Sequence, residues 1–160
     1  MELWWSLLPV LILIIITLPS FKILYISELD YLPIGTVKII RSQWYWTYEY
    51  NDFNLSQLDS FIKTSYAPYE FRLLETDNYL TLSCLTSYRC LVTSSDVIHS
   101  FSLPSINIKI DSNPNLVNRT LLYSLVPGLF YGECSEICGI NHSIIPIKVE
   151  ICLPRMLQLQ

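Results

Sequence analysis

Cys134 and Cys138 lie four positions apart, and His142 lies four positions beyond the second cysteine. A turn with this spacing can aim two thiolates and one imidazole into one small volume. His99, the only other histidine of the chain, stands far upstream. Thiolates are soft donors that suit Cu(I), zinc or iron–sulfur clusters, and imidazole suits copper and zinc. The pattern therefore predicts a metal site, provided that the fold carries His99 to the later motif.

Several kinds of site would use these four residues. Two cysteines and two histidines make a closed structural zinc site, although zinc ligands usually come as two close pairs. A histidine on one strand with cysteine and histidine on a later loop is the arrangement of copper sites in cupredoxin barrels. One cysteine suffices for a mononuclear blue-copper site, and a second suggests two bridging thiolates and a second copper. The two cysteines could also form a disulfide or be buried thiols, and His99 could be an ordinary core histidine.

The composition narrows the class of protein. Hydrophobic residues make up 51% of the 160 residues, and the mean hydropathy of +0.37 is high for a soluble domain of this size. The net charge of −4 excludes a nucleic-acid partner, because phosphate binding needs a basic patch. An acidic surface favours a basic partner instead. The five cysteines are an odd number and a poor disulfide framework.

The N-terminal segment is expected to be a helix that crosses a membrane. Leu3–Phe21 is almost wholly apolar, and about 20 such residues span the hydrocarbon core. Trp4 and Trp5 lie where an interfacial aromatic belt belongs, and Lys22 would extend toward the headgroups. A cleaved signal peptide is the alternative, but no basic residue precedes the apolar run. We assign residues 1–27 to a transmembrane helix.

Residues 28–153 are expected to form one β domain. Ile106, Ile108 and Ile110 alternate with polar residues, which is the period of a half-buried strand. Many short strands separated by turn residues favour an all-β sandwich or Greek-key barrel, and residues 154–160 are expected to be a C-terminal tail. The expected strands are 36–41, 43–50, 71–74, 79–85, 89–93, 106–110, 120–125, 129–133 and 144–151.

Several strings of residues carry a family resemblance over essentially the whole chain. They are Gln43-Trp44-Tyr45-Trp46, Arg72-Leu73-Leu74-Glu75, Asp96-Val97-Ile98-His99-Ser100, and Pro127-Gly128 leading into Tyr131-Gly132 and the cysteine motif. With them the sequence resembles subunit II of cytochrome c oxidases. The resemblance implies a cupredoxin-like Greek-key barrel, anchored by a transmembrane helix, that holds a binuclear copper centre called CuA.

The resemblance also implies roles for the motif residues. Cys134 and Cys138 match the bridging thiolates, and His99 and His142 match the terminal imidazoles. Glu136 matches a residue whose backbone carbonyl is a weak copper ligand. Its carboxylate matches one that also reaches a magnesium ion at the interface with subunit I.

Five further residues match positions that serve partners. Trp44 matches the aromatic through which electrons enter from cytochrome c. Asp59, Asp77 and Asp96 match carboxylates that face the basic rim of cytochrome c, and Glu2 matches a carboxylate near the mouth of a proton pathway into subunit I. Four of them also have a plain structural interpretation: a strand aromatic for Trp44, turns for Asp77 and Asp96, and a solvated terminus for Glu2.

The implied function is that of the electron-transfer subunit of a proton-translocating cytochrome-c oxidase. The subunit would take electrons from cytochrome c and pass them to haem in subunit I. The implied location is the mitochondrial inner membrane, crossed once or more, with the β domain in the intermembrane space. The alternative is a membrane-anchored copper-binding domain that no longer transfers electrons, either a degenerate copy or an assembly protein.

Two features depart from the family pattern. The family usually has two membrane helices before the barrel, and this chain carries the second alone, as expected of a partial sequence or a subunit split between two polypeptides. The family also has a methionine as axial copper ligand three residues beyond the ligand histidine, where this chain has Ile145. Either Ile145 is real, or an AUA codon that specifies Met in many mitochondria was translated as Ile.

Overall fold

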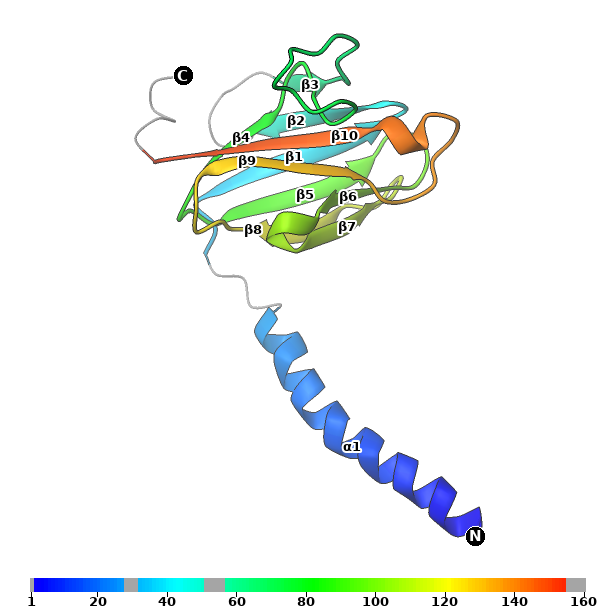
Figure 1. Ribbon diagram of the computed structural model, residues 1–160. Coiled ribbons are helices and arrows are strands. Elements are labelled where there is room, and N and C mark those ends of the chain that lie inside the picture. Colours follow the sequence, from blue (N-terminus) through cyan, green and yellow to red (C-terminus); the bar gives the residue numbers. More distant parts are fainter. Residues whose placement is uncertain (1, 28–31, 51–56, 155–160) are drawn as a thin grey trace. The chain divides into compact units, whose positions relative to one another are not determined.

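A computed structural model describes residues 2–27, 32–50 and 57–154 (Figure 1). The chain divides into two units, Met1–Tyr31 and Leu32–Gln160, and each is described by itself. The first unit holds the helix α1 (Glu2–Ser27), and the second holds all the strands of the described residues.

Helix α1 is apolar on every side. The side chains described along it are exposed, and it is the one helix among the described residues that is long and apolar enough to cross a membrane. Three of its hydroxyl groups are satisfied within the helix, because they donate to carbonyl oxygens one turn back: Ser6 to Glu2 (3.0 Å), Thr17 to Leu13 (2.7 Å) and Ser20 to Ile16 (2.7 Å). Satisfied polar groups are what a hydrocarbon environment requires.

The second unit is a sandwich of two five-stranded sheets within its described part (Figure 1). One sheet has the order β3-β2-β1-β5-β8 and the other β4-β10-β9-β6-β7. The β1–β5 and β4–β10 pairs are parallel, and the other pairs are antiparallel. The strands are β1 (Gly35–Ser42), β2 (Tyr45–Tyr50), β3 (Leu58–Ser60), β4 (Leu80–Ser83), β5 (Tyr88–Ser94), β6 (His99–Leu103), β7 (Ile108–Ser112), β8 (Asn118–Leu122), β9 (Gly128–Cys134) and β10 (Pro146–Cys152).

The core lies between the two sheets. Alternate residues of β1 point into it, among them Val37 and Ile39, which are fully buried. Trp46 of β2 meets Phe101 of β6 edge to face, with ring centroids 5.2 Å apart. This contact joins one sheet to the other. The two-sheet β architecture expected from the sequence is therefore confirmed.

The prediction of a strand at residues 71–74 is wrong. This segment is a turn in which the Leu74 N–H donates to the Phe71 carbonyl (3.3 Å) and Leu73 has φ +66°. The Phe71 ring instead packs edge to face on Tyr131 of β9 (5.4 Å). The apolar side chain of Phe71 therefore packs on the outer face of a sheet and is not part of a strand. Two short strands, β3 and β6, were not expected as strands, and Ile106 ends a 3₁₀ helix, η1 (Pro104–Ile106).

The pairing of β6 with β9 positions the metal motif. Phe101 pairs with Cys134 and Ser102 with Glu133, so the start of β6 and the end of β9 meet at one end of the sandwich. The approach is close at Gly132, where an added Cβ would lie 1.9 Å from the Ser102 carbonyl oxygen. Glycine at this position therefore permits the two strands to meet.

Candidate metal centre

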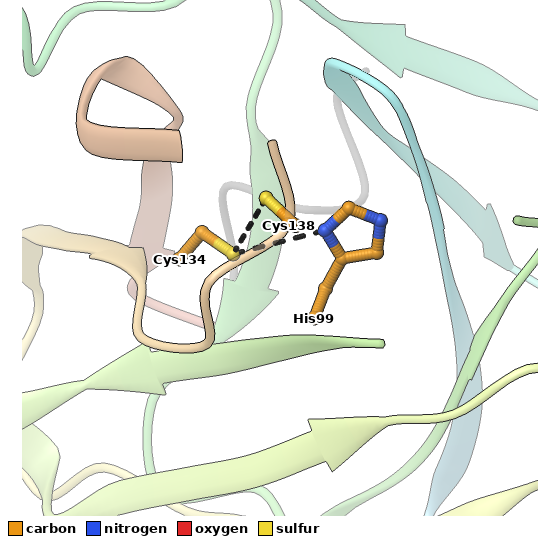
Figure 2. Close-up of side chains that lie close together, drawn as sticks. All are labelled: His99, Cys134 and Cys138. Atoms are coloured by element: carbon orange, nitrogen blue, oxygen red, sulfur yellow. Dashed lines mark hydrogen bonds between the residues drawn. The ribbon is translucent and has the colours of Figure 1, made fainter. Parts of the chain in front are cut away.

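The four predicted ligands come from three elements. His99 is the first residue of β6 and Cys134 the last of β9. Cys138 lies in the loop that follows, and His142 begins the 3₁₀ helix η2 (His142–Ile144) before β10. His99 is fully buried and both cysteines are 5% exposed. The fold thus brings the distant histidine to the later motif, and Figure 2 shows His99, Cys134 and Cys138 facing one another.

The donor atoms form a chain of short contacts. Cys134 Sγ lies 3.8 Å from His99 Nδ1 and 3.9 Å from Cys138 Sγ, and Cys138 Sγ lies 3.6 Å from His142 Nδ1. A tetrahedral metal with bonds of about 2.3 Å to sulfur and about 2.1 Å to nitrogen would set S–S and S–N separations near 3.8 and 3.6 Å. The donors therefore have the spacing of ligands that share a metal ion.

The disulfide interpretation does not fit these positions. Cys134 and Cys138 are free thiols, and their 3.9 Å separation is well beyond the S–S bond length of about 2.05 Å. His99, Cys134 and Cys138 each offer a donor atom, and these atoms all lie within 4.8 Å of one another. The residues present fit a metal ion with soft ligands.

Asp96 sets the tautomer of His99. Its Oδ1 lies 2.8 Å from His99 Nε2, so a proton on Nε2 leaves the lone pair of Nδ1 directed at the cysteines. Ligating histidines commonly donate their other ring N–H to a carboxylate in this way. Burial opposes ionisation of Asp96, but hydrogen bonds from His99 and from the backbone N–H groups of Gln43 and Val97 lower its pKa. The carboxylate is therefore held in its charged form.

The loop between the cysteines is held by hydrogen bonds to neighbouring segments. Gln43 Nε2 donates to the Cys138 carbonyl (2.6 Å), and Cys134 N–H donates to the Ile145 carbonyl (3.1 Å). Gly139 has φ +133°, a backbone conformation that favours glycine. A Cβ there would lie 3.1 Å from Gln43 Nε2 and 3.7 Å from the indole nitrogen of Trp44. Trp44, 40% exposed, therefore borders the cysteine loop.

The two thiols have unequal acidity. Burial opposes ionisation of Cys134, yet the polar groups beside it, His99 and the neighbouring backbone, lower its pKa overall. The pKa of Cys138 is raised by burial and by the charge of Cys134 beside it. One thiolate is thus stabilised by the protein alone, and the second requires a further positive charge, such as a metal ion.

The remaining predicted residues lie around or apart from this centre. Glu136 is exposed, and its backbone carbonyl oxygen lies 3.5 Å from Cys134 Sγ. Asp59 is half-buried and accepts from Thr47 Oγ1 (2.7 Å), whereas Asp77 is exposed. Glu2 lies in the first turn of α1, in the other unit. The roles assigned to these residues stay predictions.

Sequence reasoning missed two residues next to the ligands. Gln43 binds the cysteine loop, and Arg41 of β1 interacts with both cysteines from the core. Gln43 stands beside Trp44 in a string that carried the resemblance, but nothing in the sequence tied its amide to Cys138. Arg41 occupies the same alternation as Val37 and Ile39, which is the one signal that could have placed its side chain inside.

Comparison with known proteins identifies the family. Residues 35–152 match the family model described as cytochrome c oxidase subunit II, periplasmic domain. Cytochrome c oxidase subunit 2 of a Lasius ant is 50% identical over 93% of this chain, and that of Yponomeuta malinellus is 49% identical over 93%. The chain spans about two thirds of the length of these relatives, 67% and 66% respectively.

Solved structures agree with the sequence comparison. The periplasmic domain of subunit II of the Bradyrhizobium japonicum cytochrome oxidase superposes with a TM-score of 0.74 at 35% identity, covering 79% of this chain and 90% of that one. A subunit II captured as a mixed disulfide intermediate with a thioredoxin-like protein superposes with a TM-score of 0.72 at 35% identity, covering 82% and 92%. These likenesses confirm the expected cupredoxin-like fold, and with the sequence matches they show that this chain belongs to the cytochrome c oxidase subunit II family.

Proposed function

We propose that this chain is the electron-transfer subunit of a cytochrome c oxidase, and that His99, Cys134, Cys138 and His142 hold a binuclear copper centre, CuA. The observation that supports this most is the order of the donor contacts. One imidazole contacts the first thiol, the two thiols contact each other, and the other imidazole contacts the second thiol.

This order favours two metal ions over one. A single tetrahedral zinc ion needs all four donors to surround one point. The mutually close donor group consists of His99, Cys134 and Cys138, and His142 reaches it through its contact with Cys138. A pair of coppers held by these two thiolates and two imidazoles would use the same three contacts.

The protein residues prepare the centre for electron transfer. When bound, two coppers that share two thiolates supply a one-electron centre in which added charge spreads over both metals. Burial of His99 and the cysteines excludes water from their donor atoms. Asp96 holds the His99 ring through a 2.8 Å contact, and Gln43 holds the cysteine loop. Ligands fixed in this way move little when the charge changes, so reorganisation is small.

The surface near Trp44 is the proposed docking site for cytochrome c. Trp44 is exposed beside the cysteine loop and would receive the electron. Asp59, Asp77 and Asp96 would face the basic rim of cytochrome c and speed its approach. The electron would then pass to haem in subunit I, where oxygen is reduced and protons are moved.

The other proposed partners belong to the membrane complex. Glu136, exposed beside Cys134, would contribute to a magnesium site shared with subunit I, and Glu2 would lie near the mouth of a proton pathway. Helix α1 would anchor the β domain to the mitochondrial inner membrane, with the domain in the intermembrane space. The length and apolar surface of α1 support this anchor.

A second candidate function is copper binding without electron transfer, as in a degenerate copy or an assembly protein. The relative captured in a mixed disulfide with a thioredoxin-like protein favours a thiol partner during assembly. A reductant of that kind would keep Cys134 and Cys138 in the free form that copper needs. Both candidates use the same cysteines, so the redox behaviour of the loaded centre must separate them.

The test is copper loading of the full chain in detergent, followed by metal analysis and EPR spectroscopy. We expect two coppers per chain and, after one-electron oxidation, a hyperfine pattern from one unpaired electron shared equally by two copper nuclei. Cys138→Ser should abolish the shared-electron signal, whereas Cys90→Ser, at a buried free thiol of β5, should keep it. One copper per chain, or preferential zinc binding, would refute the binuclear centre. An intact centre that cytochrome c cannot reduce would favour the second candidate.

A further inference from the structure

Arg41 is a charged residue in a core position. It follows Val37 and Ile39 on the inner face of β1, and like them it is 0% exposed. Arginine is almost never fully buried unless it is paired. Its guanidinium remains protonated in proteins, so β1 places a permanent positive charge between the two sheets.

The guanidinium makes few direct polar contacts. Among the described residues, its three nitrogens find no partner with hydrogen-bond geometry. Its Cζ lies 4.9 Å from the centroid of the Trp46 ring, within the range of a cation–π contact. An unpaired buried donor is costly. A charge in this position therefore needs compensation by opposite charges nearby.

The nearby negative groups belong to the metal centre. The guanidinium lies over the Trp46 ring, which meets Phe101, the residue that pairs with Cys134. From this position its charge interacts with the thiols of Cys134 and Cys138 and with the carboxylate of Asp96. Two thiolates and one carboxylate bring negative charge, and Arg41 brings one positive charge from the core side. The guanidinium is thus fully buried on the core side of the ligands, whereas Trp44 is exposed beside the cysteine loop.

We propose that Arg41 sets the reduction potential of the copper centre by placing a fixed positive charge behind the two cysteine ligands. This inference rests on the proposed function. Reduction moves one electron from cytochrome c to the copper pair, breaks no bond and lowers the charge of the centre by one. A neighbouring positive charge therefore favours the reduced state and raises the potential. Arg41 acts through the thiolates and touches no substrate.

A purely structural role fits the contacts less well. The structural hydrogen bonds of this residue use its main chain: the Arg41 carbonyl accepts from the Ser95 N–H (2.9 Å) and the Ser95 hydroxyl (3.1 Å). Any residue at position 41 would keep them. Methionine would fill a similar volume without a charge, so Arg41→Met tests the charge with little change in packing volume.

The experiment is a potentiometric titration of the copper-loaded full chain in detergent, with EPR at each step. Arg41→Met should change the electron-exchange equilibrium constant at least tenfold toward the oxidised centre. This corresponds to a fall in the midpoint potential of about 59 mV for one electron. Arg41→Lys should keep most of the wild-type potential. Lys38→Met is the matched control, because it removes a positive charge from the outer face of the same strand, where Lys38 pairs with Glu49 (3.1 Å). The midpoint potential of the copper centre in this variant should equal that of the wild type.

The outcomes separate this inference from the proposed function. A wild-type chain without a binuclear copper signal refutes the proposed function. A normal signal in Arg41→Met with an unchanged potential, or an equal fall in Lys38→Met, overturns the role of Arg41. If Arg41→Met loads no copper, Arg41→Gln replaces it as a second neutral variant. Loss of the centre in both neutral variants, with the centre retained in Arg41→Lys, makes the charge a requirement for assembly and overturns the potential-setting role.

Discussion

Replacing Asp96 with asparagine should weaken copper binding, because it disturbs the orientation of His99. The carboxylate accepts four hydrogen bonds: from His99 Nε2 (2.8 Å), Val97 N–H (2.6 Å) and Ser94 Oγ (3.2 Å) at Oδ1, and from Gln43 N–H (2.6 Å) at Oδ2. Asparagine has one carbonyl oxygen, and its NH₂ group would face at least one of these donors. Asp96→Asn therefore removes the negative charge and breaks part of the network.

The size of the effect follows from the surroundings of Asp96. Loss of a carboxylate that orients a ligating histidine typically costs 10- to 100-fold in metal affinity, or about 1.4 to 2.7 kcal/mol. The Asp96 side chain is 29% exposed, so solvent screens part of the interaction. We expect the lower end, about tenfold.

The assay is competition for Cu(I) with a calibrated chelator at fixed pH, without cytochrome c. Asp77→Asn is the matched control, because Asp77 accepts two backbone N–H groups (2.7 Å each) but is not a partner of His99. Equal affinities for the two variants would refute the role of Asp96 in holding His99. Since Asp96 is also a predicted docking residue, only a measurement without the partner isolates this role.

Trp44→Ala should slow reduction of the loaded centre by cytochrome c while leaving the concentration dependence of docking nearly unchanged in stopped-flow kinetics; an unchanged rate would place electron entry elsewhere. The double variant Asp59→Asn, Asp77→Asn should be reduced more slowly by cytochrome c at low salt. The difference from wild type should disappear as the Debye length falls to about 8 Å at physiological ionic strength. A rate deficit that does not depend on salt would argue against a docking role for these carboxylates. Burial opposes ionisation of Glu75, but a buried lysine and a tyrosine hydroxyl lower its pKa overall. The ionised carboxylate therefore stabilises the fold above the unfolded pKa, and this contribution is lost as pH falls through the lower folded pKa. Glu75→Gln should flatten this part of the acid dependence of the free energy of unfolding, and an identical dependence in both proteins would contradict the prediction. A mass spectrum of the native peptide that contains position 145 should show a Met-sized residue if AUA was mistranslated, whereas an Ile-sized residue predicts a higher potential than in Met-bearing relatives, because the axial ligand tunes such sites.

Hydrophobic periodicity and residue type were enough to predict the fold class and the helix. Alternation at Ile106, Ile108 and Ile110 and the turn residues between the expected strands predicted a β sandwich or barrel, because half-buried strands must alternate to bury one face. The apolar segment predicted α1 by length alone. Residues 71–74 were predicted wrongly, since Phe71 and Leu73 are residue types that suit a strand but lie in a turn. Local propensity cannot reveal which apolar residues meet the outer face of a sheet.

The metal centre divides in the same way. Cys134, Cys138 and His142 lie within one short stretch of the chain, so their spacing alone predicted that they could share a metal site. The pairing of β6 with β9 decided that His99 joins them, and the Asp96 contact decided which ring nitrogen faces the cysteines. Only the tertiary structure turned Arg41 into a charge behind the thiolates, because its position in the chain is separated from theirs by several strands. The sequence by itself determined which atoms can bind a metal; the packing of the two sheets determined the charges that surround it.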